Sequence, residues 1–213
     1  MAVPTIAAAD TYTQATFSGG VFPGNANVQP PFAGNGFNQG DPISGSFVFD
    51  NDLVPPAGSG FFNVYASSFP DVSNIPNANL FSVSLDTLSF DAGGNLNSQL
   101  PSTGAQYNNG QFNGLEFITD FAFQGNSYQF RIDGPNVSVL PVDSFGNPTS
   151  FQPLISGYIN LGNSSLTNET AFTPVAAPPP PGAPEPTSWA LLLLGVFATG
   201  SALRGRRHRA VAA

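Results

Sequence analysis

Apolar and small polar side chains alternate in this chain with a period of two residues, and this pattern limits the folds that it can adopt. In the segment 43–50 one set of alternate positions holds Ile43, Gly45, Phe47 and Phe49. Ser44 and Ser46 lie in the other set. Successive side chains of a β-strand point to opposite faces, so this spacing predicts a strand that buries one face. No segment before residue 187 shows the helical period of about 3.6 residues.

The alternation changes phase once, in the middle of the chain. Phe81, Val83 and Leu85 share one phase, whereas Leu88 and Phe90 continue in the other. A slip of one residue moves every side chain to the opposite face of a strand. We therefore expect either a bulge or a break between two strands near Asp86-Thr87.

Turn-forming residues separate the remaining alternating runs. The runs 115–123 and 128–132 flank the turn 124–127, which predicts a hairpin. Residues 155–161 give one more strand, and Gly, Pro and Asn recur between the runs. Residues 10–172 are therefore predicted to form an all-β domain, an antiparallel β-sandwich or barrel-like fold.

A proline-rich segment follows this domain. Residues 173–186 contain seven prolines in 14 positions. Proline lacks the N–H that ladders and helix interiors need, so this segment is predicted to be a linker. In polyproline II geometry it forms a stalk of about 40 Å, at roughly 3.1 Å per residue.

An uncharged apolar run comes next, from Thr187 to Leu203. As a helix, its 17 residues reach about 25 Å, close to the roughly 30 Å of a bilayer core, so a single transmembrane helix is predicted for 187–203. Its membrane anchor residues are Trp189, Leu191, Leu192, Leu193, Leu194, Val196, Phe197 and Leu203. A positive stop follows, formed by Arg204, Arg206, Arg207 and Arg209. The positive-inside tendency places this basic tail, 204–213, in the cytoplasm.

The order Pro184-Glu185-Pro186, apolar run and arginine cluster resembles a PEP-CTERM sorting signal. The resemblance covers roughly residues 183–209. It implies a bacterial protein that is exported across the inner membrane, tethered there by its tail, and processed near Pro184, Glu185 and Pro186 by an exosortase. The implied partners are the exosortase and the inner membrane, and the implied destination is the cell surface or the extracellular matrix. Proteins with this signal typically occur in bacteria that make exopolysaccharide.

Export requires a signal peptide, and the first nine residues fit only its end. Met1 to Ala9 is apolar and finishes with the small residues Ala7-Ala8-Ala9. A basic n-region and a full apolar h-region are missing. Our hypothesis is that residues 1–9 are the remnant of a signal peptide whose longer leader lies upstream of a misplaced start codon.

Charge and composition exclude several classes of function. The chain has no cysteine and no lysine, and residues 10–183 hold twelve acidic residues against one base, Arg131, a formal charge of −11. Nucleic acids are bound mainly through Lys and Arg, so a nucleic-acid partner is not expected. The one histidine, His208, lies in the basic tail, so the exported part lacks the residues for a catalytic triad or a Cys/His zinc site.

Carboxylate chemistry is the enzymatic possibility that remains. Glycosidases need two acids about 5–9 Å apart. Glu116 and Asp120 lie on one predicted strand at about 13 Å, which is too far, although Asp133 could approach across a hairpin. Acids on a solvated strand face are the simpler interpretation, and we expect no enzyme and no cofactor.

Two groups of residues are candidates for binding sites. Asp50 and Asp52, with Asn51 between them, offer oxygen ligands for calcium, but a turn in which they bond their own backbone is the preferred interpretation. A sugar site needs an exposed aromatic platform, for which the candidates are Tyr12, Tyr65, Tyr107, Tyr128 and Tyr158. Tyr107 is the one expected at the surface.

These observations predict a non-enzymatic, exported and membrane-tethered β-domain with a structural or adhesive role. The alternative is a module that binds glycan, with exopolysaccharide as its partner. A carboxylate-based hydrolase is the third alternative.

Overall fold

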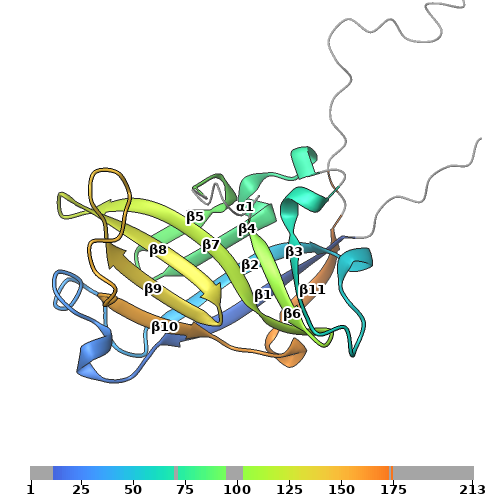
Figure 1. The fold of residues 1–213 in the computed structure, drawn as a ribbon, viewed down its shortest axis with the longest axis horizontal. Helices are drawn as coiled ribbons and strands as arrows, with labels where there is room; N and C mark the ends of the chain where they lie inside the picture. Colours follow the sequence, from blue (N-terminus) through green and yellow to red (C-terminus); the bar gives the residue numbers. More distant parts are fainter. Residues whose placement is uncertain (1–11, 70–71, 95–102, 173, 175–213) are drawn as a thin grey trace, which may run out of the picture. The chain divides into compact units, whose positions relative to one another are not determined.

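The computed structural model describes residues 12–69, 72–94, 103–172 and 174, which all belong to a compact unit formed by residues 1–175. These residues form a single antiparallel sheet of eleven strands that curls into a half-barrel (Figure 1). The predicted all-β, antiparallel fold class is therefore confirmed.

The strands are β1 (Tyr12–Val21), β2 (Pro42–Asp50), β3 (Phe61–Tyr65), β4 (Phe81–Leu85), β5 (Leu88–Asp91), β6 (Gly104–Asn108), β7 (Gln111–Phe123), β8 (Asn126–Gly134), β9 (Asn136–Pro141), β10 (Ile155–Ile159) and β11 (Thr167–Phe172). One short α-helix, α1 (Asn77–Leu80), precedes β4. The single-turn 3-10 helices are η1 (Asn25–Asn27), η2 (Asn51–Leu53), η3 (Ala66–Ser68), η4 (Val72–Asn74), η5 (Ala92–Gly94) and η6 (Asn163–Ser165).

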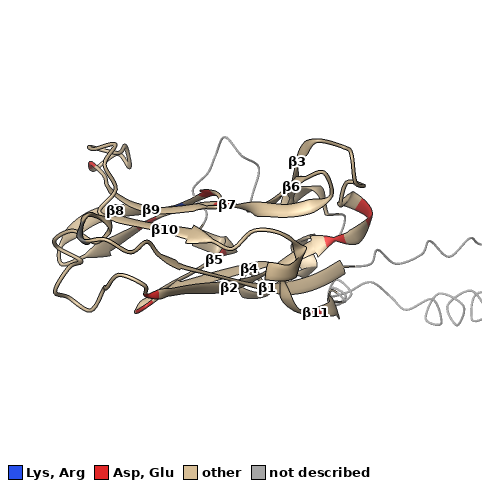
Figure 2. Ribbon diagram, turned by 90° about the horizontal axis from the view of Figure 1, so that it is seen from below, with Lys and Arg blue, Asp and Glu red and all other residues tan. Residues whose placement is uncertain are grey.

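The strands pair in the order β3-β6-β7-β8-β9-β10-β1-β2-β4-β5, and β11 pairs with β1. Strands β6 to β9 follow one another as a meander. Because the sheet curls, β6 to β9 form one layer that faces a second layer of β1, β2 and β4 (Figure 2). Each strand therefore has an inner face toward the other layer and an outer face away from it.

Phenylalanine rings fill the space between the two layers. Phe81 of β4 stacks on Phe117 of β7 with ring centroids 4.6 Å apart, and Phe47 of β2 stacks on Phe112 of β7 at 5.4 Å. The alternation that predicted the strands thus places these rings on the inner face. Their apolar area, removed from water, is the main source of stability for such a fold.

Two predicted turns are confirmed, one from the change of phase near Asp86 and one from the turn residues 124–127. β4 and β5 form a hairpin in which Leu85 pairs with Leu88, so the slip near Asp86 is a break between two strands. β7 and β8 form a second hairpin around Gln124 and Gly125. Both of these residues have positive φ, 49° and 78°, which suits the twist of a tight hairpin.

Two parts of the domain differ from the prediction or were not predicted. Leu161 was expected to continue the face of Ile155, but β10 ends at Ile159 and Leu161 is exposed. The long loop 22–41 was not predicted to contribute to the core. It inserts Phe32 and Phe37 into the core, where Phe32 stacks on Phe123 with centroids 4.8 Å apart.

The predicted linker 173–186, apart from Pro174, the transmembrane helix 187–203 and the basic tail 204–213 lie outside the described residues. Within the part of the chain that the structure describes, no helix is long and apolar enough to cross a membrane.

Candidate ligand-binding face

The sorting motif Pro184, Glu185 and Pro186 lies outside the described residues, as do the predicted membrane anchor and the arginines of the positive stop. Residues 1–9, the predicted remnant of a signal peptide, lie outside them too. The structure therefore bears on the function of the β-domain, and not on the tail.

Asp50 and Asp52 form a turn. The carboxylate of Asp50 is buried at the end of β2, and its Oδ1 accepts a hydrogen bond from the backbone N–H of Asp52 at 2.9 Å. Asp50 thereby caps the single turn η2, which is the arrangement that the sequence favours over a calcium loop. In the described part of the chain, no group of three or more His, Cys, Asp or Glu residues is placed to hold a metal ion.

Of the acids considered for hydrolysis, Asp133 approaches Glu116 across the β7–β8 hairpin, the arrangement that the sequence left open. Glu116 of β7 lies directly opposite Asp133 of β8, so these two carboxylates are cross-strand neighbours. Asp120 lies four residues further along the same face of β7, where it accepts a hydrogen bond from Gln129 at 3.1 Å. Glu116 was expected to be solvated, but only 9% of it is exposed. That expectation was wrong because polar side chains of β3 and β6 cover it.

The tyrosine expected at the surface is buried. Tyr107 is 2% exposed, because the inner face of β6 points between the layers, where its ring packs against Phe112. Burial and the charge of Glu169 raise its pKa well above the usual value. Tyr12 and Tyr128 are buried as well, and Tyr65 is half-buried, which leaves Tyr158 as the exposed tyrosine.

A row of side chains crosses the outer face of the sheet at one register. Tyr158 of β10 pairs with Asn136 of β9, Asn136 pairs with Asp133, and Asp133 pairs with Glu116. Directly opposite residues share a face, so these four side chains project from the same side. At about 4.8 Å between strands, the row extends for roughly 14 Å.

An exposed aromatic pair ends this row. The rings of Tyr158 and Phe22 have centroids 5.2 Å apart at an angle of 30°, and each residue is more than a third exposed. Gly20 of β1 lies opposite Tyr158, and a Cβ at Gly20 would come within 3.7 Å of the tyrosine hydroxyl. These are ordinary contact distances, so the Tyr158 ring lies over β1 at Gly20.

Asp133, a member of this row, forms an ion pair with Arg131, which lies on the same face two residues earlier in β8. Arg131, the single basic residue among those the structure describes, donates from Nη2 to Oδ2 of Asp133 at 2.7 Å. The side chains of both residues are about half exposed, so the pair is solvated and contributes little to stability.

Glu116 lies at the other end of the row in a buried polar cluster. Its Oε1 accepts hydrogen bonds from Nε2 of Gln106 at 2.7 Å and from Nδ2 of Asn63 at 3.1 Å. Asn63 also donates to the hydroxyl of Tyr65 at 2.9 Å. Burial and the neighbouring Glu116 carboxylate raise the pKa of Tyr65, against the hydrogen bond from Asn63, which lowers it.

The loop between β9 and β10 presents two exposed phenylalanines. Phe145 is 87% exposed and Phe151 is 100% exposed. Oδ1 of Asp143 fixes the loop by accepting the backbone N–H groups of Asn147 at 2.9 Å and Phe145 at 2.8 Å. These two bonds lower the pKa of Asp143.

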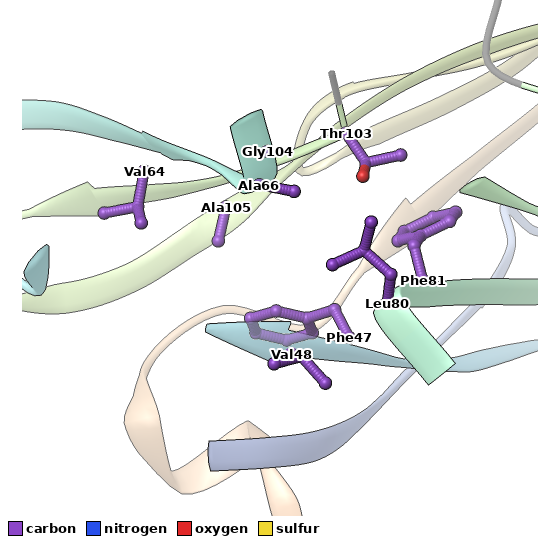
Figure 3. A pocket seen from close by; sticks show the side chains of 9 residues that line it. All are labelled: Phe47, Val48, Val64, Ala66, Leu80, Phe81, Thr103, Gly104 and Ala105. Atoms are coloured by element: carbon purple, nitrogen blue, oxygen red, sulfur yellow. The ribbon is translucent and has the colours of Figure 1, made fainter. Parts of the chain in front are cut away.

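The interior offers no room for a ligand at the gap shown in Figure 3, where side chains of β2, α1, β3 and β6 converge. The gap between Phe47, Phe81 and Thr103 has a volume of about 10 Å³, which is roughly the space of one water molecule. The outer face is therefore the better candidate for binding, since it combines an aromatic platform with convergent polar groups.

Comparisons with protein-family models, with curated proteins and with solved structures find no match for this chain. Sequence reasoning named Tyr158 among five tyrosines, but it missed Phe22 as its partner. Phe22 follows β1 in an irregular loop, so no periodicity places it beside β10.

Proposed function

We propose that this protein is an exported surface or matrix protein of bacteria, whose tail is a sorting signal and whose β-domain has a structural or adhesive role. The order of Pro184-Glu185-Pro186, the uncharged run 187–203 and the arginine cluster carries this proposal. On this account the proline-rich segment is a stalk, and residues 187–203 form a transmembrane helix that holds the β-domain outside the inner membrane. An exosortase then cleaves the chain near the motif and releases it to the surface.

The composition of the β-domain supports the same proposal. Its polar surface is built largely from Ser, Thr, Asn and Gln, and the chain has no cysteine and no lysine. Its excess of acidic residues favours solubility and mutual repulsion, and disfavours nucleic acid as a partner. No catalytic step is proposed.

Substitution of the motif tests the sorting proposal. The chain carrying Pro184→Ala and Pro186→Ala is expected to stay in the inner-membrane fraction, whereas the wild-type chain reaches the surface or the medium. The matched control is Pro179→Ala with Pro180→Ala, which removes two prolines from the same linker and leaves the motif intact. Equal fractionation of both double variants would contradict the proposal.

The aromatic pair on the outer face favours a second candidate function, the binding of glycan. Tyr158 and Phe22 offer exposed rings for the apolar faces of sugar rings, and Asn136 and Asp133 beside them offer hydrogen-bonding groups. Because the domain is acidic, a neutral polysaccharide is a better ligand than an anionic one. Such binding would give the adhesive role a molecular basis.

Affinity electrophoresis in gels that contain a neutral or a uronate-containing polysaccharide tests this second candidate. The full chain in non-ionic detergent should be retarded by the neutral polymer, and Tyr158→Ala should weaken binding about tenfold or more, a loss of ~1.4 kcal/mol. Phe151→Ala, which removes an aromatic ring that is fully exposed on a loop, is the matched control. Retardation that is unchanged in Tyr158→Ala, or equally lost in Phe151→Ala, would exclude this face as the glycan site.

A further inference from the structure

Three Asn-Gly pairs occur in the chain, and each carries the groups for a reaction within its own backbone. They are Asn35-Gly36, Asn109-Gly110 and Asn113-Gly114. The backbone nitrogen of the glycine can attack the side-chain amide carbon of the asparagine, because glycine has no side chain to shield that nitrogen and its backbone turns freely. Since the local sequence offers the same reaction at all three pairs, the surrounding structure decides which of them reacts.

The pair Asn113-Gly114 is held inside the sheet. Both residues lie in β7, where Gly114 pairs with Gln106 of β6. A Cβ at Gly114 would come within 2.1 Å of the backbone of Gly134, so the end of β8 packs closely against this glycine. The attack requires the backbone between the asparagine and the glycine to turn. That turn would break the pairing of β7, so the fold protects Asn113.

The pair Asn109-Gly110 forms the turn between β6 and β7 and is held by the loop before β3. The backbone N–H of Asn109 donates to the carbonyl oxygen of Gly60 at 2.8 Å, and its Oδ1 accepts the backbone N–H of Gly60 at 3.1 Å. A Cβ at Gly110 would lie 3.0 Å from the carbonyl oxygen of Pro55, so the same loop covers the glycine. Although Asn109 is exposed, its side-chain amide is therefore tied to a distant segment of the chain.

The pair Asn35-Gly36 lies in the loop 22–41, and both residues are exposed. Gly36 has a φ of 104°, a conformation that favours glycine. The N–H of Asn35 donates to the carbonyl oxygen of Phe32 at 3.0 Å, and its Nδ2 donates to the carbonyl oxygen of Pro31 at 2.6 Å. Both bonds run within the same turn of the loop. The backbone of this pair can therefore turn without breaking a strand pairing or a contact to a distant segment.

We propose that Asn35 is the first of these three asparagines to undergo deamidation in the folded β-domain. The nitrogen of Gly36 forms a bond to Cγ of Asn35, the Cγ–Nδ2 bond breaks, and Nδ2 leaves as ammonia with the proton of the Gly36 nitrogen. The product is a five-membered succinimide ring. Water then adds to one of the two ring carbonyl carbons and opens the ring, which leaves aspartate or isoaspartate at position 35. The reaction needs neither the sorting signal nor a glycan.

This modification loosens the loop 22–41. The carboxylate of Asp86 lies beside the pair, because a Cβ at Gly36 would be 3.3 Å from its Oδ2. Either product places a second negative charge near that carboxylate, and like charges repel. Isoaspartate also adds one carbon atom to the main chain between Phe32 and Phe37, whose buried rings pack with centroids 5.3 Å apart. The longer chain shifts one of these rings relative to the other.

Peptide mass spectrometry tests the site, after the full chain has been incubated in mildly alkaline buffer with non-ionic detergent. The mass change from NH₂ to OH marks each modified peptide. Asn35 should convert at least about fivefold faster than Asn109 or Asn113, a ratio that corresponds to about one hydrogen bond of additional restraint. In concentrated urea the three asparagines should convert at comparable rates, since only the local sequence then remains. Conversion of Asn109 or Asn113 as fast as Asn35 in the folded chain would overturn the proposal.

Thermal unfolding before and after the same incubation tests the effect on the loop. The midpoint of the wild-type chain should fall by about 2–4 °C as Asn35 converts. Asn35→Gln is the matched control, because its longer side chain would have to close a six-membered ring, which forms far more slowly. Its midpoint should be the same before and after incubation. A constant midpoint in a wild-type chain that has converted at Asn35, or an equal fall in Asn35→Gln, would contradict the loosening of the loop.

Discussion

Glu116 and Asp133 lie directly opposite each other on the outer face of the β7–β8 hairpin, and of the two only Asp133 is bonded to a basic residue within the described part of the chain. Like charges at opposite positions of a sheet destabilise it. Arg131, two residues before Asp133 on the same strand face, therefore offsets the repulsion between the two acids. The Arg131–Asp133 pair is solvated, so its contribution is small.

Arg131→Met should lower the free energy of unfolding by about 0.5–1 kcal/mol, because the two carboxylates then face each other uncompensated. Urea denaturation of single and double variants measures this effect. In an Asp133→Asn background the same substitution should cost nearly nothing, since no repulsion remains. An equal cost in both backgrounds would mean that Arg131 acts through its apolar stem rather than through its charge.

At neutral pH, Tyr107→Phe should leave the domain as stable as the wild type or stabilise it by up to about 1 kcal/mol. The reason is that the buried hydroxyl of Tyr107 has no hydrogen-bond partner in the described part of the chain, and its removal relieves an unsatisfied polar group. Urea denaturation near pH 7 measures the difference. A loss of more than 1 kcal/mol would show that the hydroxyl has a partner.

The burial of Tyr107 also predicts that the free energy of unfolding falls at alkaline pH. Burial holds its pKa in the folded state above the unfolded value of about 10. Between about pH 10 and the folded pKa only the unfolded chain ionises at this tyrosine, so the stability present below about pH 10 declines as the pH rises toward the folded pKa. Wild-type unfolding curves should show a decline of up to about 1.4 kcal/mol per pH unit above pH 10 that Tyr107→Phe reduces. Parallel declines in both chains would contradict the prediction.

Gly19→Ala should destabilise the domain far more than Gly20→Ala, although the two residues are neighbours in β1. A Cβ at Gly19 would lie 1.9 Å from the carbonyl oxygen of Tyr158, so the backbone of β1 or β10 would have to move. At Gly20 the nearest atom, a backbone oxygen of Asp41, is 3.5 Å away, an ordinary contact. We expect a loss of about 2 kcal/mol or more for Gly19→Ala and less than about 0.5 kcal/mol for Gly20→Ala, measured by urea denaturation.

Acid should loosen the β9–β10 loop before it unfolds the sheet. Backbone N–H groups of Asn147 and Phe145 stabilise the ionised carboxylate of Asp143 and lower its pKa. These two hydrogen bonds therefore stabilise the loop fully at pH values above about 3.9, the pKa of Asp143 in the unfolded chain. Their contribution is lost as the pH falls through the lower pKa of Asp143 in the folded chain. Asp143→Ala should produce the same loosening at neutral pH. Amide exchange at Phe145 and Asn147 measures it, and unchanged protection in Asp143→Ala would contradict this role.

The sequence predicts the strands better than it predicts their surroundings. Phe81 and Phe117 were assignable to buried faces because a strand imposes a period of two on its own residues. The positions of Phe32 and Tyr107 were not assignable, because they depend on how the sheet curls and on which layer lies opposite. Tyr107 was expected at the surface because its neighbours are Asn and Gly, yet the inner face of β6 determines its burial.

The candidate face was predictable only in part for the same reason. Glu116, Asp133 and Tyr158 could each be assigned to a strand, but their alignment in one row depends on the register of four strands. Local sequence sets the register of a hairpin such as β7–β8, where the turn is short. The pairing of β10 with β1, which brings Tyr158 next to Phe22, joins distant segments and has no local signal.

An intact mass measurement of the mature chain tests whether the tail directs export and processing. A tag placed in the β-domain allows the mature chain to be recovered from cells with and without the exosortase. Cells with the enzyme should yield a chain shortened at or near Pro184-Glu185-Pro186, located at the surface or in the medium, and cells without it should yield the uncleaved tail. A full-length C-terminus in the inner membrane of both cell types would contradict the sorting assignment and reduce the tail to an anchor.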